Sequence, residues 1–95
     1  MNLADDDDSA ERQRMLQREI LSYLAQHPDA KDTVEGIMHW WLPDTDTGVR
    51  ASDVGSALEG LALKGWVTVS SLGQGTRVYG LERARRGEIL EWLEN

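Results

Sequence analysis

The first strong pattern in the chain is a row of apolar residues at helical spacing. It predicts an amphipathic helix from about Ser9 to Gln26, because side chains three and four positions apart share one face of a helix. Ser9 and the acidic residues before it suit the positive N-terminal end of a helix, and Pro28 ends the pattern. The apolar face comprises Leu16, Ile20, Tyr23, Leu24 and His27, with Met15 and Leu21 lying off it.

Two more helices are expected at similar spacing. The second starts at Asp32, whose carboxylate we expect to cap the free N–H groups while Glu35 reaches back, and Pro43 ends it. The third starts after Ser52, a good N-cap, and ends at Gly65. The residues expected to face inward are Val34, Ile37, Met38 and Trp41 in the second helix and Val54, Ala57, Leu58 and Leu61 in the third.

After Gly65 the pattern becomes that of a β-hairpin. Residues 66–70 are rich in strand-forming types, residues 73–75 (Gly-Gln-Gly) favour a tight turn, and residues 76–81 return as a second strand. A last helix is expected from about Ala84 to Glu94. The predicted order is therefore three helices, a hairpin and a final helix.

The run Val54-x3-Leu58-x2-Leu61-x3-Gly65-Trp66-Val67, the glycine turn and then Tyr79-Gly80-Leu81 form one continuous motif. This motif resembles the recognition helix and wing of small bacterial regulators in the winged helix-turn-helix superfamily. The resemblance covers most of residues 9–95. It implies an α+β, mostly helical fold with a three-helix bundle, a two-stranded hairpin wing and a C-terminal helix. The alternative is a generic α+β domain with a C-terminal hairpin, and neither fold fixes a function.

Length and charge restrict the classes of function. Ninety-five residues suffice for one domain, expected over residues 9–95, and the run Asp5–Asp8 marks residues 1–8 as an acidic disordered tail. Removing those four negative charges from the net charge of −7 leaves −3 for the rest, which argues against general nucleic-acid binding. Residues 1–9 do not have the pattern of a signal peptide, and no apolar run approaches about 20 residues, so we expect a cytoplasmic protein without a membrane span.

The outward face of the third helix favours a protein partner over DNA. Its outward positions are Asp53, Ser56, Glu59, Gly60 and Leu63. Helices that read DNA carry Arg, Lys, Asn or Gln at such positions. Ser52, Ser56 and Gly60 form a smooth stripe that another backbone can approach, Leu63 offers an apolar contact, and Glu59 a charge at the rim. The alternative is that Gly55 and Gly60 serve close packing inside the domain.

DNA binding is the second hypothesis. Arg77 lies in the predicted wing, Arg83 and Arg85 follow it, and Arg50 precedes the third helix, so these residues could form a local edge that contacts phosphates. Glutamates interleave with the same arginines and could instead pair with them on the last helix.

The tryptophans supply further interface candidates. Trp41 and Trp66 are expected in the core, whereas Trp40 falls on the other side of its helix and Trp92 lies on the short last helix. Exposed Trp side chains are effective interface anchors. In many winged-helix proteins the first and last helices carry the dimer contact, for which Met15, Leu21, Leu90 and Trp92 would serve. Alternatively, the last helix folds back and buries Trp92 in its own domain.

Neither catalysis nor a cofactor is indicated. The chain has no Cys, and His27 and His39 lack metal-ligand spacing. Asp44–Gly48 resembles half of a calcium loop, but Gly55 occupies the twelfth position, where a Glu is needed, so no metal is expected. We therefore predict a non-enzymatic binding module of a bacterial cytoplasm that contacts a protein partner or a second copy, with a DNA-binding transcriptional regulator as the alternative.

Overall fold

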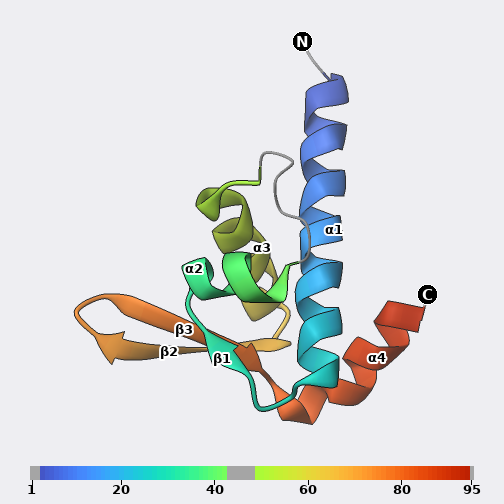
Figure 1. Cartoon of the computed structure of the whole chain (residues 1–95). Coiled ribbons are helices and arrows are strands. Elements are labelled where there is room, and N and C mark those ends of the chain that lie inside the picture. The colour runs from blue at the N-terminus through green and yellow to red at the C-terminus, as the bar shows by residue number, and fades with distance from the viewer. Residues whose placement is uncertain (1–2, 43–48, 95) are drawn as a thin grey trace.

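The computed structural model describes residues 3–42 and 49–94, with side chains described from residue 10 onward. The fold is α+β and mostly helical, as expected. Figure 1 shows α3 and α4 packed along the long helix α1, while the β2–β3 hairpin projects away from it. The elements are α1 (Leu3–Gln26), β1 (Lys31–Asp32), α2 (Val34–Gly36), η1 (Ile37–Trp41), α3 (Ala51–Leu63), β2 (Val67–Gly73), β3 (Thr76–Leu81), η2 (Arg83–Arg85) and α4 (Arg86–Glu94).

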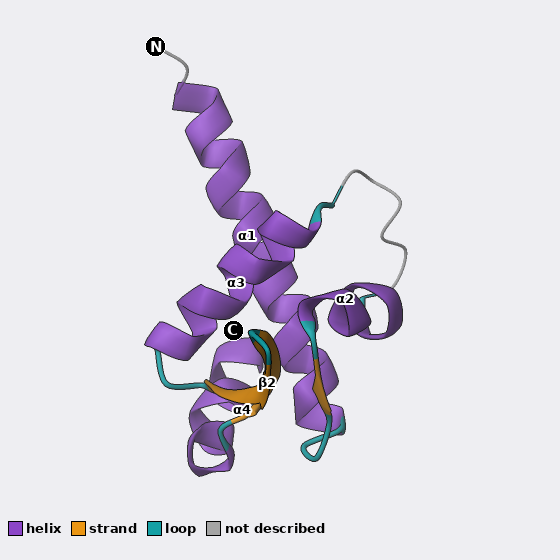
Figure 2. Ribbon diagram, turned by 90° about the vertical axis from the view of Figure 1, so that its left-hand side faces the viewer, coloured by secondary structure: helices purple, strands orange, loops and turns teal. Residues whose placement is uncertain are grey.

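Helix α1 begins well before the expected start at Ser9. It includes Asp5–Asp8, a segment that the charge pattern alone predicts to be a disordered tail. Acidic residues in the first turns of a helix face the positive end of its dipole, which favours continuing the helix through them. The first turns extend beyond the other elements in two perpendicular views (Figures 1 and 2). None of the helices in the described part of the chain is both long and apolar enough to cross a membrane.

The apolar face of α1 packs into the core as predicted, with two corrections. His27, expected to continue this face, is exposed, because the helix ends at Gln26, one residue before it. Leu16, Ile20 and Leu24 are buried, and the Tyr23 ring stacks on Trp41 with ring centroids 4.8 Å apart. Leu21, offered above as a dimer contact, is fully buried within its own chain. Helix α1 packs against both α3 and α4, so it needs apolar residues on two sides and leaves Leu21 no accessible surface.

The second helical segment starts with a different cap from the one expected. The Thr33 hydroxyl, not the Asp32 carboxylate, accepts the Gly36 N–H at 3.2 Å. Asp32 instead belongs to β1 and accepts the Thr33 N–H at 2.8 Å. The segment then widens into the π-helical turn η1, which buries Trp41 and leaves Trp40 77% exposed.

Helix α3 begins at Ala51, so Ser52 lies inside it and is not the N-cap. The Asp53 carboxylate accepts the Arg50 N–H at 3.0 Å, which explains the earlier start. The four inward residues predicted for this helix, Val54, Ala57, Leu58 and Leu61, are fully buried. Gly65 follows the helix with φ of +80°, the left-handed conformation expected of a C-terminal glycine.

The sheet has three antiparallel strands in the order β1-β3-β2. The hairpin was expected, but β1 was not, because two polar residues give no alternating pattern. Only the base of the hairpin is buried, through Val67, Tyr79 and Leu81. The hairpin turn has positive φ at Gly73, Gln74 and Gly75.

The chain ends in the turn η2 and the helix α4, slightly later than the expected start at Ala84. Ile89 is fully buried, and the half-buried Trp92 contacts the edge of Trp66 with ring centroids 5.7 Å apart. The half-buried Trp66 packs against the core. Helix α4 therefore folds back on its own domain.

Candidate binding groove between α3 and the hairpin

An open hollow of about 480 Å³ lies between the C-terminal half of α3 and the hairpin. We call it the α3–hairpin groove. Its lining residues are Glu59, Ala62 and Leu63 from α3 and Val69, Arg77 and Tyr79 from the hairpin. The groove therefore joins two residues expected at a protein interface, Glu59 and Leu63, with one expected to contact DNA, Arg77.

The packing of the two elements accounts for the groove. Val54, Ala57, Leu58 and Leu61 hold one side of α3 in the core, so Glu59 and Leu63 lie at its exposed margin. In the hairpin, Val69 pairs with Tyr79 and Ser71 with Arg77, which places these side chains on one face of the sheet because side chains alternate along a strand. Val67 and Leu81 are buried at the inner end of that face, Val69 and the buried Tyr79 form the next pair, and Arg77 lies further out.

Two exposed apolar side chains line the groove. Leu63 is 89% exposed and Val69 is 45% exposed, and both line the same hollow. Single exposed apolar residues are common, but neighbouring ones around a concavity with polar residues at its edge are typical of interaction sites. Removing such apolar surface from water favours the binding of a partner that covers it.

The charge around the groove is mixed. Glu59 lines it beside Arg77, and on the other side of Arg77 a second hollow of about 400 Å³ is lined by Glu35, among other residues. The single cation therefore lies between two hollows that each carry a carboxylate. Such a face does not concentrate positive potential, which binding to a phosphate backbone requires.

The predicted stripe of small residues on α3 is only partly outward. Ser56 is exposed, but Gly60 faces α1, because a Cβ added there would lie 2.7 Å from the Gln17 side-chain nitrogen. That nitrogen donates a hydrogen bond to the Ala57 carbonyl at 3.2 Å. Gly60 thus makes room for a contact between α1 and α3. For this residue, close packing inside the domain, the alternative given above, is what the structure has. Gly55 has no such neighbour within 4 Å of its Cβ position.

The two tryptophan candidates lie elsewhere. Trp40 is exposed on η1 and does not line the α3–hairpin groove. Trp92 lies on α4 and lines a different hollow, between α1 and α4. Of the residues predicted for a protein interface, only Glu59 and Leu63 therefore line the α3–hairpin groove.

Two of the four arginines expected to contact DNA form ion pairs with acidic side chains. Arg83 forms an ion pair with Asp29, and Arg85 forms one with Glu88 at 2.8 Å. Arg50 is exposed at the start of α3, and Arg77 is exposed on β3. The glutamate pairing weighed for Arg85 is thus present, whereas the Asp29 contact of Arg83 comes from the loop after α1.

Val69 and Tyr79 were not among the predicted site residues, although the sequence contains the signal that places them. The alternation of the two strands, once aligned in register, puts both on the face that carries Arg77. The segment Asp44–Gly48, considered above for calcium, lies outside the described residues.

No family model matches the chain, and neither a curated protein nor a solved structure matches it.

Proposed function

We propose that the chain is a winged-helix domain that binds a protein through the α3–hairpin groove and performs no catalysis. The order of three helical segments, hairpin and closing helix supports this fold, as does the positive φ of Gly65 between α3 and β2. The observation that carries the function is the exposure of Leu63 beside Val69 in a hollow edged by Glu59 and Arg77.

The partner would present an apolar side chain to Leu63 and Val69, with polar groups facing Glu59 and Arg77. Apolar contact at the centre with charge at the rim is the usual arrangement of protein interfaces. The partner is either a different protein or a second copy of this chain, in keeping with a cytoplasmic interaction module.

Site-specific photo-crosslinking in cells tests this proposal. A photoreactive amino acid is introduced at Leu63 or at Val69, and in a control at Glu19, an exposed residue on α1 that does not line the groove. We expect the same crosslinked partner, or the same crosslinked dimer, from the first two positions and not from Glu19. Crosslinks that are equal at all three positions would contradict the proposal.

DNA binding is the second candidate, and the exposed Arg77 on the projecting hairpin favours it. A contact between Arg77 and a phosphate predicts that Arg77→Gln weakens binding to all duplex sequences alike and reduces the slope of log K against log salt by about one. A titration with mixed-sequence duplexes at several salt concentrations measures this slope. An unchanged slope would exclude that contact.

A further inference from the structure

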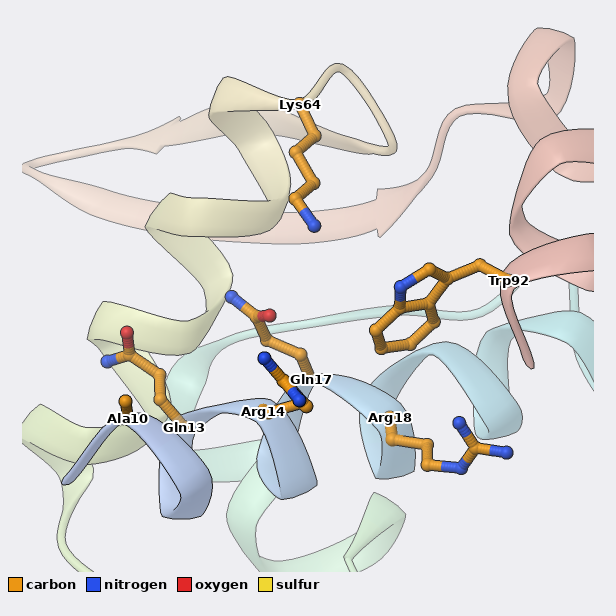
Figure 3. A pocket seen from close by; sticks show the side chains of 7 residues that line it. All are labelled: Ala10, Gln13, Arg14, Gln17, Arg18, Lys64 and Trp92. Atoms are coloured by element: carbon orange, nitrogen blue, oxygen red, sulfur yellow. The ribbon is translucent and has the colours of Figure 1, made fainter. Parts of the chain in front are cut away.

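A second hollow, of about 450 Å³, lies where α1, the end of α3 and α4 meet. Its lining residues are Ala10, Gln13, Arg14, Gln17, Arg18, Lys64 and Trp92. We call it the basic pocket, after Arg14, Arg18 and Lys64. Figure 3 shows the Lys64 side chain extending from the end of α3 toward α1, with the Trp92 indole and Arg18 on one side of the space.

The charge of this pocket is opposite to that of the chain. The protein carries 17 acidic and 10 basic residues, yet three basic residues and no carboxylate line this hollow among the residues whose side chains are described, from Ala10 onward. Within the part of the chain whose side chains are described, the ion pairs involve Arg83 and Arg85 and none of these three. Like charges gathered in one hollow repel each other, and a bound anion removes that repulsion.

Two of the three cations are held in place before any ligand arrives. The Arg18 guanidinium donates a hydrogen bond to the Leu93 carbonyl and lies 5.8 Å from the centre of the Trp92 ring. The Lys64 ammonium lies 5.0 Å from the Trp66 ring centre and 5.6 Å from that of Trp92. These cation–π contacts limit the movement of the charged groups, which lowers the entropy cost of binding an anion.

Packing on the tryptophan rings alone does not account for the whole arrangement. It explains Lys64 and Arg18, whose stems cover apolar surface as long basic side chains often do. It does not explain Arg14, which lies one helical turn before Arg18 on the same face of α1 and lines the pocket without contacting either ring in the described structure.

We propose that the basic pocket binds a phosphate dianion, either free or as the monoester group of a small molecule. Three positive charges match a dianion better than a single carboxylate, and Arg guanidinium groups pair with phosphate oxygens through two hydrogen bonds. The Trp92 ring already contacts two cations, so it is not the platform for an aromatic ligand. The volume lies in the range of small-molecule sites and leaves space for an organic group beyond the phosphate.

The test is an NMR titration of the whole chain with sodium phosphate at pH 8, with ionic strength held constant by sodium chloride. We expect saturable shifts of the Trp92 indole N–H and of amides near Arg14 and Lys64. Glycerol 2-phosphate is titrated in parallel, and saturation by either compound supports the proposal and identifies the source of the phosphate group. Shifts that rise linearly with both, or that chloride reproduces, would overturn it.

Arg14→Gln is the decisive variant, because Arg14 makes no described contact that holds the fold. We expect it to weaken phosphate binding roughly tenfold, the loss typical of one charge-assisted pair. Arg12→Gln is the matched control, since it removes the same charge from the same helix at a residue that does not line the pocket. If both variants weaken phosphate binding equally, the loss comes from the change in net charge and not from the pocket, which would contradict the proposal. Shifts of the same resonances by a DNA duplex, with none from either phosphate compound, would also overturn it.

Discussion

The two glycines in the middle of α3 have different surroundings, and the difference predicts opposite outcomes for the same substitution. Beyond its chain neighbours and the backbone of its own helix, no atom lies within 4 Å of the Cβ position of Gly55, so Gly55→Ala is expected to stabilise the protein by about 1 kcal/mol through helix propensity alone. At Gly60 the same gain is offset. A Cβ there would lie 2.7 Å from the Gln17 side-chain nitrogen and displace it from the Ala57 carbonyl.

The lost hydrogen bond of Gln17 is worth about 0.5–1.5 kcal/mol, which cancels the propensity gain and leaves Gly60→Ala close to neutral. Urea unfolding followed by circular dichroism measures both variants. Thermal unfolding should separate them by about 4–8 °C, the shift expected for 1 kcal/mol in a domain of this size.

A background that lacks the Gln17 side chain sharpens the comparison. In Gln17→Ala, the substitution Gly60→Ala no longer displaces a hydrogen-bonded group, so it should stabilise the protein as much as Gly55→Ala does. The coupling between Gln17 and Gly60 is then about 1 kcal/mol in a double-mutant cycle. Equal stabilisation by Gly55→Ala and Gly60→Ala in the wild-type background would refute the reasoning. Gly60 would then face outward with Ser52 and Ser56, as the sequence predicted.

Three further substitutions test how local structure is held. Thr33→Ala removes the hydroxyl that caps the second helical segment and should cost about 1 kcal/mol by urea unfolding, whereas a cap made by Asp32 would leave stability unchanged. Gly65→Ala forces a side chain into the left-handed conformation and should cost about 1 kcal/mol, and no loss would mean that this φ is not required. Leu58→Ala empties a fully buried site and should cost about 2–5 kcal/mol, and a loss below 1 kcal/mol would contradict the described core.

The parts of the fold that the sequence predicted are those set by neighbours along the chain. The inward residues of α3 follow from helical spacing, and Gly65 and the residue 73–75 turn follow from backbone conformations that glycine favours. The parts that were missed depend on contacts between distant segments. Strand β1 forms because Lys31 and Asp32 pair with Gly80 and Tyr79, and a sequence of two polar residues does not predict that pairing.

The candidate sites show the same division. Helical spacing placed Leu63 outward correctly, because the buried face of α3 is well marked. It could not tell that Gly60 faces Gln17, since that depends on how α1 crosses α3. The basic pocket was missed altogether, because Arg14, Lys64 and Trp92 lie far apart in sequence and gather only when α1, α3 and α4 pack together.

The most direct test of protein binding through the α3–hairpin groove compares two exposed leucines. Leu63 lines the groove, whereas Leu72 is 72% exposed on the hairpin and does not line it. Both are changed to Glu, and the dissociation constant is measured for the partner or the homodimer that crosslinks at Leu63. We expect Leu63→Glu to weaken binding at least 30-fold, because burying a leucine contributes about 2 kcal/mol, and Leu72→Glu to leave it unchanged. Equal affinities for wild type and Leu63→Glu would contradict the account.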